Sequence, residues 1–319
     1  MGLAINFMNE FELIELLTRH LPTHPSVVQG PGDDCAILDL GLPDKFVLFK
    51  TDAIVEEIHF KSEAAPEKVG HKALGRCLSD IAGMAGTPLY ALITLGLPRQ
   101  FNALYLESIY VGLRSLAEAH HVTIVGGETT TNPDRILISV ALLGTVPKDK
   151  YALRSGAKAG DAVFVTGQLG GSSLGKHLEF EPRVHEARWL TEHFSIHAMM
   201  DISDGLAGDL KHILKASNVG AELLSSAIPI SQAARMQANS EAASKTPLLA
   251  ALTDGEDFEL LFTVASRDAV PLLDAWKTQF PKLLLSCIGR ITTGRTLMIR
   301  QKDALTEITL HGYTHFEKS

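Results

Sequence analysis

The sequence lacks a block of basic residues, paired cysteines and a long apolar run, and each absence excludes a class of protein. The formal net charge is −8, so we expect no nucleic-acid partner. The three cysteines, Cys35, Cys77 and Cys287, form no CxxC pair, which argues against a disulfide framework and a thiolate zinc site and fits a reducing cytoplasm. No stretch approaches the roughly 20 apolar residues of a membrane helix. The acidic N-terminus also lacks the cationic start of a signal peptide, so we expect no membrane partner.

Length and composition predict a folded protein with two domains. The chain has 319 residues, of which 45% are apolar and 21% charged, and a chain of this length usually builds more than one core. A polar segment with glycines and a proline at 147–161 marks the junction. We therefore expect an N-terminal domain over residues 1–148 and a C-terminal domain over residues 149–319.

Hydrophobic periodicity predicts strands and helices mixed in both halves. An apolar stripe at helical spacing predicts a strong helix over 102–121 and a shorter helical stripe over 11–17. Short apolar runs predict strands at 46–52, 90–97, 122–127, 136–146, 161–171, 258–266 and 283–292. Residues 199–214 are interpreted as a loop that enters a helix. The mixture predicts the α/β class, with α+β character.

Acidic residues beside glycines recur in six predicted loops. They are Asp33, Asp34, Asp52, Asp80, Glu128, Asp201, Asp204, Glu256 and Asp257. Any single one has an ordinary explanation, because aspartate next to glycine is common turn and capping chemistry. The recurrence favours a site for hard cations such as Mg²⁺, which prefers one or two carboxylates per ion. Phosphoryl transfer needs such cations, because they neutralise the charge of the transferred group.

One glycine-rich segment is similar to a phosphate-binding loop but does not match it. The segment GGSSLGKH at 170–177 has the Gly-Lys pair of a P-loop. His177 stands where the motif requires the Ser or Thr that binds Mg²⁺. The P-loop interpretation is therefore rejected.

The motifs in chain order resemble the thiamine-monophosphate kinase family, within the superfamily of aminoimidazole ribonucleotide synthetase and selenide water dikinase. The matching strings are GDDCAIL, KTDAIVEEIHF, KALGRCLSDIAGMAGTP, IVGGETTT, LRSGAKAGD, VTGQLGGS, DISDGLAGDL, DGEDFELLFTV and HGYTHF, from residue 32 to 316. The resemblance implies an enzyme that transfers the γ-phosphate of ATP to thiamine monophosphate, with several Mg²⁺ ions. It also implies two α/β domains, with the N-terminal sheets pairing across a homodimer.

The resemblance also implies roles for individual residues. The metal ligands would be Asp34, Thr51, Asp52, Asp80, Glu128, Asp201 and Asp204, with Asp33 adjacent to the metal site. ATP would be bound by Tyr110, Gly127, Glu128, Arg154 and Ser203. The thiamine substrate would be bound by His59, Glu256 and Tyr313. A phosphate monoester is already an anion at neutral pH, so we expect no general base; the metal ions and Arg154 would neutralise charge instead.

Two positions depart from the family pattern. Glu128 stands where aspartate is usual, so its carboxylate reaches one methylene further. Lys50 stands where a hydroxyl residue is often found, and an ammonium cannot ligate Mg²⁺, although the backbone carbonyl of Lys50 could.

Two alternatives stay open from the sequence, and a third, a metal-dependent phosphatase, is disfavoured because the acidic loops lack metal-binding histidines. The first is another ATP-using enzyme of the same superfamily with a different acceptor. The second is a non-catalytic module that binds divalent cations, although the calcium-loop pattern D-x-[DN]-x-[DN]-G is absent.

Overall fold

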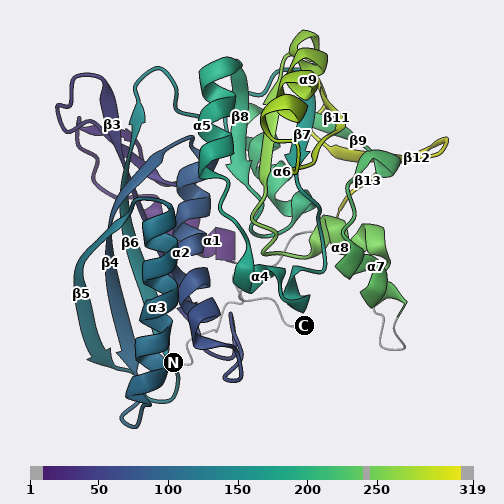
Figure 1. The fold of residues 1–319 in the computed structure, drawn as a ribbon. Coiled ribbons are helices and arrows are strands. Elements are labelled where there is room, and N and C mark those ends of the chain that lie inside the picture. Colours follow the sequence, from purple (N-terminus) through teal and green to yellow (C-terminus); the bar gives the residue numbers. More distant parts are fainter. Residues whose placement is uncertain (1–9, 240–244, 310–319) are drawn as a thin grey trace, which may run out of the picture.

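The structure, a computed structural model, describes residues 10–239 and 245–309 and contains two β-sheets with helices packed against them (Figure 1). The N-terminal half forms a six-stranded sheet in the order β1-β2-β3-β6-β4-β5. Its strands are β1 (Val27–Gln29), β2 (Ala36–Leu38), β3 (Lys45–Val55), β4 (Thr87–Leu97), β5 (Thr123–Thr131) and β6 (Leu137–Pro147). Its helices are α1 (Glu10–Thr18), α2 (Pro66–Gly83) and α3 (Ala103–Ala119).

The C-terminal half forms a seven-stranded sheet in the order β13-β12-β9-β11-β7-β10-β8. Its strands are β7 (Ala162–Thr166), β8 (Ile196–Asp201), β9 (Gly220–Leu224), β10 (Leu260–Val264), β11 (Leu285–Thr292), β12 (Leu297–Gln301) and β13 (Ala304–Glu307). Its α-helices are α4 (Lys176–Glu179), α5 (Val184–His193), α6 (Leu206–Ser217), α7 (Gln232–Ala238), α8 (Pro247–Thr253) and α9 (Ala269–Gln279). Three short 3₁₀ turns complete it: η1 (Ser172–Leu174), η2 (Ser225–Ala227) and η3 (Ser266–Asp268).

Helix α2 is the central element of the molecule and joins the two halves. It begins at Pro66, whose fixed φ suits the first helical position. It packs on α3 and β3 on the N-terminal side, and on α5 and β8 on the C-terminal side. Figure 1 shows it between the two sheets. One continuous hydrophobic core therefore includes Leu74 and Leu78 of α2 together with Phe164 and Phe262 of the C-terminal sheet.

The two faces of the N-terminal sheet differ in what covers them. Side chains alternate between the faces of a strand, and along β3 the inward positions 48, 50, 52 and 54 are less exposed than the outward positions 49, 51 and 53. Helices α2 and α3 lie on the inner face (Figure 1). The outer face, at the left of the figure, has no helix from the described residues over it.

The predicted α/β class is confirmed, and the predicted strands and helices match observed elements within a few residues. Three local interpretations were wrong. Asp80 lies inside α2 rather than in a loop, Asp52 and Glu128 lie inside β3 and β5, and residues 199–201 end strand β8. The helix was missed because α2 contains glycines and places charged residues such as Lys72 and Asp80 at buried positions, which does not fit the pattern of a surface helix. Within the described ranges, every helix is too short or too polar to cross a membrane.

Candidate active site

Three buried carboxylates from distant parts of the sequence meet where α2 passes between the sheets. Asp34 lies in the loop before β2, Asp80 in α2, and Asp201 at the end of β8. One carboxylate oxygen of each lies within 4.8 Å of the others. We call these three residues the acidic cluster. Buried carboxylates repel one another and lose their hydration, so such a group requires cations.

Arg154 supplies one of those cations. Its Nη2 and Nε donate to Asp34 Oδ1 at 2.6 and 3.0 Å, and its backbone nitrogen donates to Asp33 at 3.1 Å. The second oxygen of Asp34 is buried and has no hydrogen-bond partner among the residues that the structure describes. A buried carboxylate oxygen without a donor fits a hard divalent cation, since carboxylate oxygen is the ligand that Mg²⁺ prefers.

The remaining carboxylates have raised proton affinities. Burial, together with the charge of Asp34, raises the pKa of Asp201 to about 7, although Ser79 Oγ donates a 2.5 Å hydrogen bond to it. Burial and Asp34 likewise raise the pKa of Asp33 to about 7. Burial also raises the pKa of Asp80 well above its usual value. The arrangement therefore holds more negative charge than its own cations balance, and a bound cation would lower these pKa values.

Gly83 makes the close approach of these groups possible. A Cβ built on Gly83 would overlap Asp34 Oδ2 and lie 3.0 Å from the backbone nitrogen of Asp201. Alanine is favoured over glycine in a helix by about 1 kcal/mol, so the requirement for glycine here is steric.

We expect Gly83→Ala to lower kcat/KM on the order of a hundredfold, because it displaces the Asp34 carboxylate from the cluster. Steady-state kinetics with Mg²⁺ titration would measure this. Gly30→Ala is the matched control, since a Cβ there meets only a Val27 methyl at 3.8 Å. Wild-type kinetics in Gly83→Ala would contradict the steric argument.

A second line of charged side chains follows one face of α2. Lys72, Arg76 and Asp80 are spaced four residues apart, so they lie above one another on the helix. Arg76 Nε donates to Asp52 at 3.1 Å, and Lys50 Nζ lies 2.9 Å from Asp80. Four residues of a helix rise about 6 Å and two residues of a strand about 6.6 Å. Because α2 and β3 run antiparallel, every fourth residue of α2 therefore lies opposite every second residue of β3.

Lys72 connects the halves through a buried ion pair. Its Nζ lies 2.7 Å from Glu256 and donates to the His59 carbonyl at 2.5 Å. His177 Nδ1 lies 2.8 Å from Lys72 Nζ and 3.1 Å from Glu256. Two predicted substrate residues, His59 and Glu256, therefore meet through a lysine that the sequence analysis did not single out.

Other predicted residues lie away from the acidic cluster. Thr51 occupies an outward position of β3, so only its backbone faces the inner side. Glu128 is exposed on β5, where its carboxylate accepts from the Thr129 nitrogen. Strands β3 and β5 are separated by β6 and β4, a distance of about 14 Å at the usual strand spacing. Within one chain, Gly127 and Glu128 are therefore not brought to the three carboxylates.

The loop after β8 carries two more predicted residues, and helix α6, which follows it, carries one that was missed. The Ser203 carbonyl accepts from the Glu256 nitrogen at 2.7 Å, which ties this loop to the Glu256 loop. The Asp204 nitrogen donates to Asp209 Oδ2 at 3.0 Å. Asp209 is buried in α6, and burial raises its pKa well above the usual value. Its spacing of five residues from Asp204 offered no signal in the sequence.

Two predicted residues, Tyr110 and Tyr313, have no described contact with the acidic cluster or with the Lys72–Glu256 ion pair. Tyr110 of α3 is half-buried and packs against the hydrophobic core, and burial raises its pKa. Tyr313 lies outside the described residues. In the rejected P-loop segment, Lys176 Nζ pairs with Glu259 at 2.9 Å rather than standing free for a phosphate.

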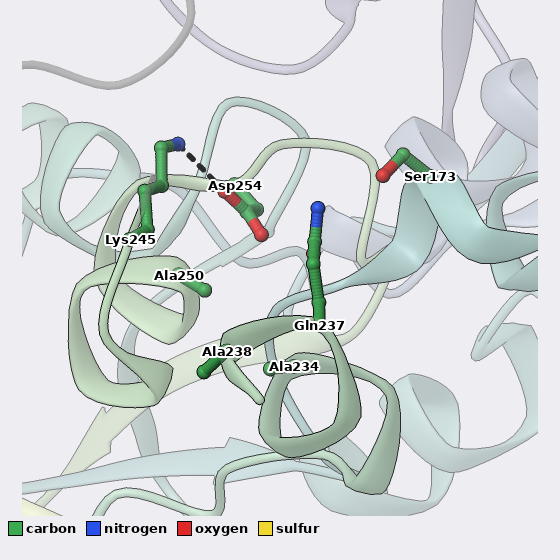
Figure 2. Close-up of a pocket in the computed structure, with 7 residues that line it drawn as sticks. All are labelled: Ser173, Ala234, Gln237, Ala238, Lys245, Ala250 and Asp254. Carbon is green, nitrogen blue, oxygen red and sulfur yellow. Dashed lines mark hydrogen bonds and ion pairs between the residues drawn. The ribbon is translucent and has the colours of Figure 1, made fainter. Parts of the chain in front are cut away.

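A small pocket of about 110 Å³ lies in the C-terminal half (Figure 2). It is lined by Ser173, Ala234, Gln237, Ala238, Lys245, Ala250 and Asp254. The Lys245–Asp254 ion pair, at 2.7 Å, closes one side. None of the predicted site residues lines this pocket, so the cluster and not this cavity identifies the candidate site.

Comparison with known proteins gives consistent matches over most of the chain. Two family models match: AIR synthase related protein, N-terminal domain, over residues 32–146, and AIR synthase related protein, C-terminal domain, over residues 158–278. The thiamine-monophosphate kinase of Rhodopirellula baltica is 42% identical over 79% of this chain and 80% of its own length. That of Bacillus subtilis is 32% identical over 97% of this chain and 100% of its own length.

Solved structures show the same fold. The structure described as "AaThiL complexed with AMPPCP and TMP" matches with a TM-score of 0.83 and 30% identity, covering 99% of both chains. Hydrogenase maturation protein HypE in complex with ATP matches with a TM-score of 0.70 at 17% identity, covering 92% of both chains. At that identity the second match supports the fold alone.

Proposed function

The chain belongs to the thiamine-monophosphate kinase family, and we propose that it transfers the γ-phosphoryl group of ATP to the phosphate of thiamine monophosphate. The products are thiamine diphosphate and ADP. The observation that carries the proposal is the acidic cluster of Asp34, Asp80 and Asp201, whose members lie within the residues that the two family models match. The structural neighbour complexed with AMPPCP and TMP supports ATP and thiamine monophosphate as the substrates.

We propose Mg²⁺ as the metal, held by Asp34 and Asp201, with Asp80 beside them. The unpartnered oxygen of Asp34 and the acceptor-only chemistry of the set support this choice. When bound, Mg²⁺ supplies positive charge against the phosphate oxygens. Asp52, Asp204, Thr51 and Glu128 remain proposed ligands, with Thr51 acting through its backbone.

The chain's own groups position and neutralise the substrates. Arg154 is held rigidly by Asp34, so its guanidinium can face anionic oxygens without first being ordered. The acceptor phosphate is already anionic at neutral pH and needs no general base. Positioning and charge neutralisation are therefore sufficient for transfer.

We assign the remaining predicted contacts as proposals. Arg154, Ser203, Gly127, Glu128 and Tyr110 would bind ATP. His59, Glu256 and Tyr313 would bind the thiamine substrate. The link between His59 and Glu256 through Lys72 supports a common substrate side.

The boundary between residues 148 and 149 is supported by the family models, which end at 146 and begin at 158. A cytoplasmic location is likewise a proposal, supported by the free cysteines Cys35, Cys77 and Cys287.

We propose that the outer face of the N-terminal sheet pairs two copies of the chain. Its large apolar side chains are 38–56% exposed on four adjacent strands: Phe49, Tyr90, Leu92, Val125 and Leu143. A contiguous apolar patch of this kind is unusual on a monomer surface. Pairing would bury the patch and would cover Thr51 and Glu128, which lie on the same face.

Leu92→Arg is expected to convert the dimer to a monomer, because it places a charge in the centre of this face. Light scattering after size-exclusion chromatography would measure the mass. Leu104→Arg is the control, since Leu104 is 73% exposed on α3, on the other side of the sheet. A wild-type monomer, or a dimeric Leu92→Arg variant, would overturn this assignment.

The test of the proposed function is an assay of ADP formation from ATP and Mg²⁺ with thiamine monophosphate as acceptor, with the product identified chromatographically. Thiamine, which lacks the phosphate, serves as the alternative acceptor. The expected result is thiamine diphosphate in amounts equal to ADP. ADP formed only with another acceptor would contradict the proposal. Tight cation binding without any nucleotide turnover would favour the non-catalytic alternative.

A further inference from the structure

Lys50 occupies a position that brings a fixed positive charge to the acidic cluster. It lies on the inner face of β3, and its ammonium nitrogen is 2.9 Å from Asp80 Oδ1. The side chain is 22% exposed and lies between β3 and α2. The neighbouring ion pair between Asp52 of β3 and Arg76 of α2 fixes the position of Lys50 along the axis of α2.

The charges around the cluster divide unequally among its three carboxylates. Asp34 has Arg154 on one oxygen, and Asp80 has Lys50. Among the described residues, Asp201 accepts a side-chain hydrogen bond from the Ser79 hydroxyl alone, and the second Asp34 oxygen has no donor. The need for added positive charge is therefore concentrated between Asp34 and Asp201, and is smaller at Asp80.

We propose that Lys50 is a tethered cation of the acidic cluster, which neutralises Asp80 in place of a divalent ion and so weakens or removes one divalent binding position. This inference rests on the proposed function only for its consequence in catalysis. The charge competition itself concerns the protein and divalent cations alone.

Two consequences follow from Coulomb's law at short range. Replacing the ammonium by an uncharged group leaves Asp80 free to ligate, so divalent affinity should rise although the folded chain loses an ion pair. A conservative change to arginine keeps the positive charge and should keep the weak binding. An exclusively structural role for Lys50 would change stability but not the binding of cations.

The experiment is a Mn²⁺ titration of the full chain without nucleotide, with free Mn²⁺ counted by electron paramagnetic resonance. The variants are Lys50→Met, which retains an apolar stem, Lys50→Gln and Lys50→Arg. We expect Lys50→Met and Lys50→Gln to bind one additional ion per chain, or to bind Mn²⁺ at least tenfold more tightly. We expect Lys50→Arg to match the wild type. Lys148→Ala is the matched control, since it removes the Lys148–Asp39 pair instead.

The outcomes separate this inference from the proposed function. Unchanged Mn²⁺ affinity and stoichiometry in the Met and Gln variants would overturn the tethered-cation role, whatever their stability. If Lys50→Met does not fold without metal, recovery of the fold by Mn²⁺ at concentrations that leave the wild type unaffected would support the role. Failure of the acceptor assay would leave the Mn²⁺ result standing. An additional Mn²⁺ accompanied by a changed kcat with ATP and thiamine monophosphate would support both.

Discussion

Asp201→Asn is expected to lower kcat/KM at least a thousandfold and to make the metal-free protein more stable. The amide keeps the shape of the carboxylate and its hydrogen bond from Ser79, but it removes the charge that a cation needs. A loss of this size corresponds to about 4 kcal/mol of transition-state stabilisation, which is typical of removing a group that organises charge in an active site.

The stability effect has the opposite sign because the Asp201 carboxylate is unfavourably buried. Its pKa is raised to about 7 in the folded chain, whereas an unfolded aspartate has a pKa of about 3.9. Between these values the folded state binds more protons, so stability falls as pH rises. Asparagine does not ionise, so the variant does not lose stability in this way as pH rises. With divalent ions chelated at pH 8, the variant should gain on the order of 1–2 kcal/mol in unfolding free energy.

Kinetics and chemical denaturation in EDTA test both parts. Asp274→Asn is the control, because Asp274 is exposed on α9. An Asp201→Asn variant that is both inactive and less stable than the wild type would indicate a structural role for Asp201. A fully active variant would remove Asp201 from the site.

Glu256→Gln should destabilise the chain by about 3 kcal/mol, because it leaves the buried ammonium of Lys72 without its carboxylate. In the background of Lys72→Met, the same change should cost less than about 1 kcal/mol. A double-mutant cycle by urea denaturation measures this coupling. Equal losses in both backgrounds would show that the ion pair does not contribute.

The loss should also depend on pH. Burial lowers the pKa of Lys72 to about 8, against the raising effect of Glu256. Above this pKa the folded chain holds neutral Lys72 while the unfolded lysine stays charged up to about 10.4. In that window stability rises with pH, and the partner carboxylate matters less. The destabilisation by Glu256→Gln should therefore shrink as pH is raised from 7 to 9.5.

The sequence predicted the chemistry of the site better than its local structure. Asp34, Asp80, Asp201 and Arg154 were named from motifs, and the structure brings them together. Asp80 was placed in a loop because aspartate near glycine is common turn chemistry and Ser-Asp is common at the start of a helix. In the structure the glycine and alanine residues beside it let α2 pack closely between the sheets.

Other residues could not be found from sequence alone. Lys72, Arg76 and Asp80 are four residues apart, but this spacing becomes a signal only once α2 is known to be a helix. His177 and Asp209 reach their partners through contacts between distant segments, which no local pattern encodes. Thr51 and Glu128, in contrast, were predicted from motifs, but strand alternation places them on the outer face of the sheet. One chain alone does not bring them to the acidic cluster there.

The most direct measurement is a crystal structure of the chain with Mn²⁺ and AMPPCP, in which anomalous scattering locates the ions. We expect an ion within about 2.1–2.3 Å of carboxylate oxygens of Asp34 and Asp201, in contact with the nucleotide phosphates, and Lys50 still paired with Asp80. Ions bound only at other places, with no peak between Asp34 and Asp201, would contradict this expectation.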